Sequence, residues 1–255
     1  MSEQIELRRY GAVAEIRLNR PEKRNALTRA MYGAMADAIA AAEADAGVRC
    51  LLLSGEGASF SAGNDLVDFM TAPSLDPDTP VMRFLRALSG AAKPVVAAVQ
   101  GNAVGIGTTM LLHCDIVVLA EDAVLRMPFV ELGLVPEAAA SLILPRLLGH
   151  VRTAELLMLA QPLRAERAVE WGLANRVVST AALHAEALAI AQALAAKAPN
   201  ALRITKALIK DDTPGIAARL PKEGAHFADL LASPELKEAV SAFFEKRAPD
   251  FSKAA

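Results

Sequence analysis

Short runs of hydrophobic residues in the first half of the chain predict β-strands. Residues 13–18 alternate apolar and charged side chains, which is the pattern of a strand with one buried face. The runs at 51–53, 95–99 and 116–119 are continuously apolar, and we expect these strands to be covered on both faces. The first half of the chain is therefore expected to contain a buried sheet.

Helical periodicity separates and follows these strands. Residues 28–47 place their apolar side chains on one face, with Thr28 as the expected N-cap and Gly47 as the expected C-cap. Further helical segments are predicted at 82–88, at 106–112 and over most of the chain after residue 138. A late strand at 176–178 interrupts this helical half. The pattern as a whole predicts an α/β fold.

Two glycine-containing turns follow strands of the predicted sheet. Residues 61–65 read Ser-Ala-Gly-Asn-Asp, and residues 101–107 read Gly-Asn-Ala-Val-Gly-Ile-Gly. Two such turns can direct two backbone N–H groups at one point, which is the arrangement of an oxyanion hole. The second turn also opens a predicted helix, whose N-terminus favours a negatively charged oxygen.

Composition narrows the class of protein. The chain has 255 residues, a formal net charge of −2 and a hydrophobic fraction of 53% with only 4% aromatic residues. This charge gives no reason to expect nucleic acid or an anionic membrane as a partner. A large aliphatic core is expected, and part of the apolar surplus is expected to cover a subunit interface.

The cysteines and the termini point to a cytoplasmic protein. Cys50 and Cys114 lie in apolar surroundings, so we expect buried free thiols rather than a disulfide. Residues 94–114 are uncharged, but they contain polar residues and glycines, which favours a buried strand-turn-helix over a membrane span. The first four residues do not resemble a signal peptide.

Familiar nucleotide, hydrolase and metal motifs are absent from the sequence. The stretch 105–107 lacks the third glycine of a dinucleotide fingerprint, and Ser59 lacks the second glycine of a nucleophile elbow. The four histidines do not have the spacing of a zinc-binding HExxH motif, and no metal site is predicted. His113 lies on an apolar helix face, where core packing is its expected role.

Four stretches together resemble the crotonase superfamily of enoyl-CoA hydratases and isomerases. They are LNRPEKRNAL at 18–27, FSAGNDL at 60–66, the second glycine turn at 101–107 with CDI at 114–116, and AFFEKR at 242–247. The resemblance implies a spiral of ββα units at 1–195. A helical region at 196–255 would serve trimerisation, in a homotrimer or a dimer of trimers.

The resemblance also implies where an acyl-CoA substrate binds. The N–H groups of Ala62 and Ile106 would hold the thioester oxygen. The backbone near Arg24, Ala26 and Leu27 would line the CoA channel. Coenzyme A would enter as part of the thioester substrate, so no separate cofactor is expected.

The C-terminal motif would contribute a further part of the CoA site. Phe243 and Lys246 match positions that meet the adenine and its phosphate in relatives, often from a neighbouring subunit. A solvent-exposed charge at a helix end is an equal explanation for Lys246.

The type of reaction depends on the carboxylates. Family hydratases use two glutamates, and the corresponding positions here are Thr109 and Phe129, neither of which is a general base. Glu137 instead resembles the single catalytic glutamate of peroxisomal-type Δ3,Δ2-enoyl-CoA isomerases. Charge compensation at a helix N-terminus is the alternative role of Glu137. Glu131 is a second candidate, which could equally be a paired structural acid.

Several residues are expected to surround the acyl chain, and the reaction has alternatives. The predicted pocket residues are Leu66, Met70, Thr109, Phe129 and Leu132, with the proline-rich stretch 71–80 at its border. The leading prediction is an enoyl-CoA isomerase. Hydration of a 2-enoyl-CoA, thioester hydrolysis and a non-catalytic acyl-CoA-binding role remain alternatives.

Overall fold

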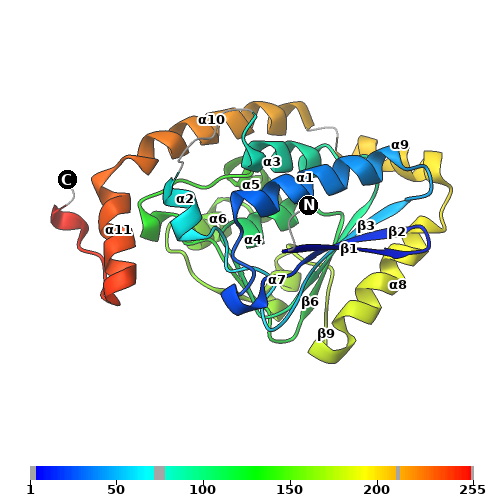
Figure 1. The fold of residues 1–255 in the computed structure, drawn as a ribbon, viewed down its shortest axis with the longest axis horizontal. Coiled ribbons are helices and arrows are strands. Elements are labelled where there is room, and N and C mark those ends of the chain that lie inside the picture. The colour runs from blue at the N-terminus through cyan, green and yellow to red at the C-terminus, as the bar shows by residue number, and fades with distance from the viewer. Residues whose placement is uncertain (1–3, 72–77, 211–212, 254–255) are drawn as a thin grey trace.

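The computed structural model describes residues 4–71, 78–210 and 213–253. Its main sheet has six strands in the order β1-β2-β3-β4-β6-β9 (Figure 1). β1 (Ile5–Tyr10) pairs antiparallel with β2 (Val13–Leu18). The remaining strands run parallel to β2, and they are β3 (Cys50–Gly55), β4 (Val95–Val99), β6 (Ile116–Ala120) and β9 (Arg176–Val178). All five predicted strands are present, and β1 is an addition to them.

A second sheet contains the short strands β5 (Asn102–Val104), β7 (Val124–Arg126) and β8 (Leu163–Arg164). β4 leads into β5 and β6 leads into β7, so successive turns of the chain place one strand in each sheet before a helical segment follows. This repetition is the ββα spiral that the resemblance implies. The stretch 101–107, predicted as a glycine turn, contains β5 as well.

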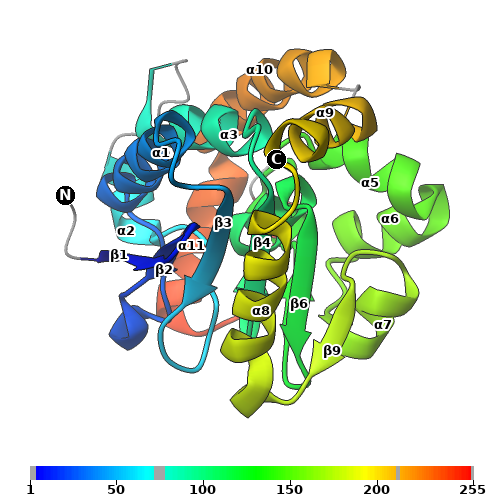
Figure 2. The ribbon, with the colours of Figure 1, turned by 90° about the vertical axis from the view of Figure 1, so that its right-hand side faces the viewer.

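Helices cover both faces of the main sheet. α1 (Arg29–Ala44) and α3 (Pro80–Ser89) lie on one face, and α8 (Leu183–Ala195) packs on the other, against β3, β4 and β6 (Figures 1 and 2). The apolar residues form one buried cluster on each side of the sheet. Both faces of the central strands are therefore covered, as their continuous apolar runs predict.

Thr28 is the N-cap of α1, as predicted. Its hydroxyl accepts a hydrogen bond from the N–H of Met31 at 3.3 Å. The helix ends at Ala44 instead of reaching the predicted C-cap Gly47. Asp45 adopts an extended conformation, and its carboxylate accepts the N–H of Gly47 at 2.7 Å.

The C-terminal half is mainly helical. Its helices are α5 (Ala140–Leu148), α6 (His150–Leu157), α7 (Ala165–Glu170), α9 (Pro199–Ile209), α10 (Thr213–Leu231) and α11 (Pro234–Glu245). α10 runs across the molecule against α3 and α5 (Figure 1). It is followed by α11, which lies at one end of the molecule next to the C-terminus (Figure 1). The boundary near residue 195 between two regions stays a prediction.

The uncharged stretch 94–114 forms the predicted strand-turn-helix. β4 and β5 are followed by α4 (Ile106–Thr109) and the 3₁₀ segment η2 (Met110–His113). Among the described residues, no helix has the length and apolar character needed to cross a membrane. Cys50 is buried and Cys114 is half-buried, and both are free thiols.

Candidate active site

The two glycine-containing turns lie side by side. Ser61 and Ala103 form a parallel bridge, in which the N–H of Val104 donates to the carbonyl oxygen of Ser61 at 2.9 Å. Gly63 has a φ of +90°, and a Cβ at this position would lie 2.8 Å from the carbonyl oxygen of Val104. The two segments can approach this closely because residue 63 is glycine.

The backbone donors of this pair of turns differ from those predicted. The N–H of Ala62 donates to the carbonyl oxygen of Arg24 at 2.8 Å, so the prediction that it serves as an oxyanion donor was wrong. Ile106 is the first residue of α4, where an N–H has no acceptor within the helix. Among the described residues, the N–H groups of Asn64 and Ile106 have no hydrogen-bond acceptor, and both are available to a ligand.

The segment predicted to line the CoA channel runs along the first turn. The N–H of Leu27 donates to the carbonyl oxygen of Gly63 at 2.7 Å, and the N–H of Asp65 donates to the carbonyl oxygen of Leu27 at 2.9 Å. Arg20 links the two segments, because its guanidinium donates to the Asp65 carboxylate at 2.7 Å and to the Ala26 carbonyl oxygen at 3.0 Å. Residues 24–27 therefore lie beside the turn that carries Asn64, and their role in lining the CoA channel stays a prediction.

Glu137 is a buried carboxylic acid, only 9% exposed, just before α5. The hydroxyl of Thr109 donates to its Oε1 at 2.6 Å. Burial raises the pKa of Glu137 to about 8, against the opposing effect of the Thr109 hydrogen bond and with a smaller contribution from the negative charge of Glu223. A carboxyl group with such a pKa can accept and return a proton near neutral pH.

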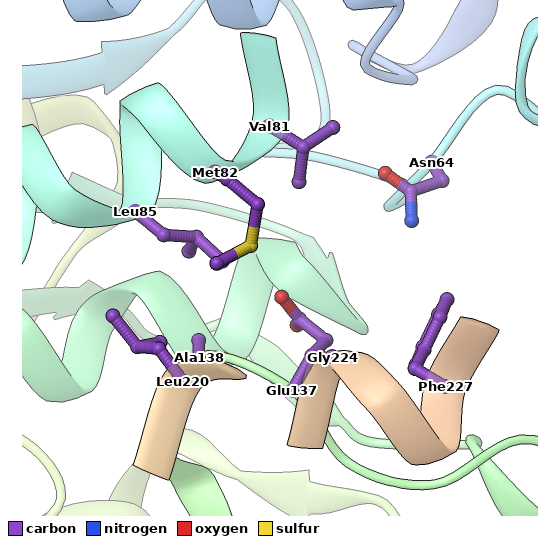
Figure 3. A pocket seen from close by; sticks show the side chains of 9 residues that line it. All are labelled: Asn64, Val81, Met82, Leu85, Glu137, Ala138, Leu220, Gly224 and Phe227. Carbon is purple, nitrogen blue, oxygen red and sulfur yellow. The ribbon is translucent and has the colours of Figure 1, made fainter. Parts of the chain in front are cut away.

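Glu137 and Asn64 line one pocket (Figure 3). The carboxylate of Glu137 points into it, towards the side chains contributed by α3 and away from its own backbone turn. The other walls are apolar side chains and small residues from α3, α10 and the turn after Glu137: Val81, Met82, Leu85, Ala138, Leu220, Gly224 and Phe227. One ionisable group in apolar surroundings is the usual composition of a small-molecule site.

The walls from α3 and α10 were not predicted from the sequence. Residues 220, 224 and 227 have the spacing of one helical face. This spacing predicts that the face is buried, but not that it packs over Glu137. Leu66, Phe129 and Leu132 are outside the lining of this pocket, so their assignment to the acyl site stays a prediction. The side chain of Met70 and residues 72–77 of the proline-rich stretch lie outside the described residues.

The remaining candidate residues have distinct surroundings. Thr109 is fully buried and contacts Glu137 directly. Glu131 forms an exposed, two-pronged ion pair with Arg126, with both contacts at 2.8 Å, so it is a paired structural acid rather than part of the pocket.

Phe243 and Lys246 are exposed at the end of α11. In the described part of the chain, no hydrogen bond or ion pair joins either side chain to the pocket. Their role in CoA binding therefore stays a prediction.

His113 is buried and neutral. Its Nε2 lies 2.8 Å from the carbonyl oxygen of Ala138, and burial lowers its pKa to about 4. It packs in the core, as predicted, and also contacts the turn that carries Glu137.

Comparison with known proteins decides the family. Residues 8–254 match the family model described as enoyl-CoA hydratase/isomerase. The chain belongs to the enoyl-CoA hydratase/isomerase family. The predicted superfamily and its crotonase-like α/β fold with a helical C-terminal region are thereby confirmed.

Relatives in this family carry out different reactions. The chain is 37% identical over 248 residues to the 1,2-epoxyphenylacetyl-CoA isomerase of Escherichia coli (strain K12), covering 94% of this chain and 95% of that protein. It is 35% identical over 262 residues to the carnitinyl-CoA dehydratase of Salmonella typhi, covering 98% of each. An enoyl-CoA hydratase/isomerase structure from Pseudoalteromonas atlantica T6c aligns with a TM-score of 0.94 at 42% identity, covering 98% of this chain and 100% of that one. The chain is thus an acyl-CoA enzyme of this family, and its reaction has to be argued from its own site.

Proposed function

We propose that this enzyme converts a 3-enoyl-CoA into the 2-enoyl-CoA, with Glu137 as its one acid–base group. The observation that carries the proposal is the isolation of Glu137, the single carboxylate among the described residues that line the pocket. Moving a double bond by one position needs one group that removes a proton and returns it. Hydration with two carboxylates is less well supported, since Thr109 and Phe129 occupy the positions of the hydratase glutamates.

The proposed reaction has two proton transfers. Ionised Glu137 takes the C2 proton, the C2–H electron pair moves into the thioester, and a dienolate forms. Protonated Glu137 then returns the proton to C4, while the double bond shifts from C3–C4 to C2–C3. With a pKa of about 8, roughly one-tenth of Glu137 is ionised at pH 7, and the apolar surroundings make that carboxylate a stronger base.

The backbone supplies the stabilisation of the dienolate oxygen. The free N–H groups of Asn64 and Ile106 lie on adjacent turns, and the second opens a helix. We assign the thioester oxygen to these two donors, with Asn64 replacing the predicted Ala62. One donor of this kind typically contributes about 3–4 kcal/mol to transition-state stabilisation.

The deciding experiment compares Glu137→Gln with wild type on a 3-enoyl-CoA and, separately, on a 2-enoyl-CoA. Glu131→Gln is the matched control, because it removes an acid from the same part of the chain but from an exposed ion pair. We expect conversion of the 3-enoyl substrate to be lost only in Glu137→Gln. Rapid hydration of the 2-enoyl substrate that survives Glu137→Gln would overturn the mechanism. Binding of acyl-CoA without turnover by the wild type would favour the non-catalytic alternative.

We further propose a homotrimer or dimer of trimers located in the cytoplasm. The helical C-terminal half exposes large apolar side chains, among them Leu208, Ile209, Phe243 and Phe244, each at least 60% exposed. Large apolar side chains left exposed on α9 and on α11 support contacts with other subunits. The free thiols of Cys50 and Cys114 suit a reducing compartment.

A further inference from the structure

The backbone that carries Glu137 has an unfavourable conformation. Ala138 and Ala139 have φ values of 58° and 57°, so two consecutive residues with a Cβ occupy the left-handed region. Such residues rarely adopt this conformation, because the Cβ comes too close to the backbone. Other parts of the protein must therefore hold the turn in place.

A carboxylate from α10 stabilises this turn by hydrogen bonds. Glu223 of α10 is 6% exposed and accepts the N–H of Ala139 at 2.6 Å. The same carboxylate accepts both the N–H of Ser141 at 3.0 Å and its hydroxyl at 2.5 Å. These contacts satisfy N–H groups at the start of α5, where the N-cap Ala139 offers no side-chain acceptor.

Two neighbours complete the support of the turn. The Nε2 of His113, from η2, lies 2.8 Å from the carbonyl oxygen of Ala138. Arg219, one helical turn before Glu223, donates to the hydroxyl of Ser141 at 3.2 Å. The turn is therefore held at Ala138, Ala139 and Ser141 by groups from η2 and α10, and Glu223 accepts three of these hydrogen bonds.

We infer that Glu223 is a positioning residue for Glu137, holding the left-handed turn so that the catalytic carboxylate faces the pocket beside Asn64. This inference rests on the proposed role of Glu137 as the base. By this inference α10 both forms a wall of the pocket and positions the catalytic carboxylate, although it is far from the active-site motifs in sequence.

Glu223 also has an electrostatic effect on Glu137. The ionisable groups that face Glu137 or its turn are Tyr32 from α1, His113 from η2, and Arg219 and Glu223 from α10. Burial raises the pKa of Tyr32 well above 10 and lowers that of His113 to about 4, so neither is charged near neutral pH. Burial raises the pKa of Glu223 as well, against the hydrogen bonds that it accepts from Ser141 and Ala139. In its ionised form Glu223 raises the pKa of Glu137, and removing that charge should lower it.

Glu223→Gln tests both effects. The amide keeps the shape but offers one acceptor oxygen instead of two, so kcat should fall at least severalfold. The inflection of kcat/KM against pH should move to lower pH, since Glu137 loses a negative neighbour. Asp229→Asn, which removes an exposed acid from the same helix, is the matched control and should change neither quantity.

A second substitution separates positioning from charge. Ala139→Gly in the Glu223→Gln background relieves the left-handed strain, because glycine adopts this conformation readily. We expect it to recover part of kcat without restoring the pH inflection. A Glu223→Gln enzyme that is merely less stable, with kcat and the pH profile unchanged, would overturn the inference.

A measurement without substrate keeps this test independent of the proposed reaction. Carbon-13 NMR of carboxyl-labelled glutamate, with the Glu137 resonance assigned from Glu137→Gln, reports the titration of Glu137 directly. A lower pKa in Glu223→Gln would support the coupling even if the wild type shows no isomerase activity. If the wild type does isomerise 3-enoyl-CoA, an unchanged Glu137 titration together with an unchanged kcat in Glu223→Gln would overturn the inference.

Discussion

Replacing Glu137 by glutamine should make the protein more stable, increasingly so as the pH rises. The pKa of Glu137 is raised by burial from 4.5 to about 8 in the folded protein. Between these two values the unfolded chain releases the proton while the folded protein keeps it. The folded state then binds more protons than the unfolded one, so the free energy of unfolding decreases with increasing pH. Glutamine cannot ionise, so the free energy of unfolding of the Glu137→Gln variant lacks this decrease with pH.

The size of the effect follows from the two pKa values. Below about pH 4.5 the carboxyl group is protonated in both states, and wild type and variant should be of similar stability. Each pH unit above this adds about 1.4 kcal/mol, which gives a difference on the order of 3 kcal/mol at pH 7. The difference should level off above pH 8, near 5 kcal/mol as an order of magnitude. Total stabilities of about 5–15 kcal/mol make such a change easy to measure.

Urea unfolding at pH 5, 7 and 9 provides the assay. The fluorescence of Trp171, the one tryptophan of the chain and 6% exposed, reports unfolding without a label. Protein concentration should be the same throughout, because association contributes to the measured stability. The glutamine side chain can still accept the hydroxyl of Thr109, so loss of that hydrogen bond should not confuse the comparison.

The slope of the stability difference with pH is the deciding quantity. A difference that stays constant from pH 5 to pH 9 would show that the pKa of Glu137 is not raised, and the argument for a base poised near neutral pH would fail. Glu131→Gln is the control, since it removes a carboxylate whose side chain is 45% exposed. It should not reproduce the slope of Glu137→Gln.

Three further predictions concern the hydrogen bonds of the site and the assembly. Thr109→Val removes a hydrogen bond that lowers the pKa of Glu137, so the inflection of kcat/KM should move to higher pH, while Thr109→Ser should leave it in place. Ile106→Pro removes a backbone donor at a helix position that tolerates proline, and kcat should fall roughly 10²–10³-fold relative to Ile106→Ala; equal rates would exclude this donor. Light scattering coupled to size exclusion should give three or six times the chain mass of 26.9 kDa, and a monomer would contradict the proposed assembly.

Five strands of the main sheet could be predicted from their apolar residues, whereas β1 was missed because its sequence IELRRY has charged side chains at three of six positions. The second sheet could not be predicted, because β5 and β7 have three residues each and β8 has two. Strands this short carry no periodicity, and β5 also lies inside the stretch that was interpreted as a glycine turn. Their existence depends on pairing with segments far along the chain. The ends of α1 show a similar limit: the side chain of Thr28 determines the start locally, but the competing contacts of Asp45 determine the end.

The oxyanion donors show how a correctly identified motif can still lead to the wrong backbone N–H group. The motif at 60–66 locates the turn, but successive N–H groups of an extended segment point in different directions. Ser61 donates to Asn102 and Ala62 donates to Arg24, and both partners come from other parts of the chain. Only after these partners are known does Asn64 emerge, because among the described residues its N–H has no acceptor and it lies in the turn beside the second glycine-containing segment. The side-chain pattern contains no information about that assignment, because the role belongs to the backbone.

Glu137 presents the opposite case, in which the residue could be predicted but the reason for its reactivity could not. The resemblance of the motif identifies the position of Glu137. The sequence alone does not show that the residue is reactive, because a carboxylate near a helix N-terminus is common in surface helices. What makes Glu137 a candidate base is its burial beneath α3 and α10 and its contact with Thr109. What holds it there is Glu223, more than eighty residues further along the chain. The chemistry of this site therefore depends on α10 as well as on the glycine-containing turns, and substitution of Glu223 should alter catalysis although its carboxylate binds the turn and not the substrate.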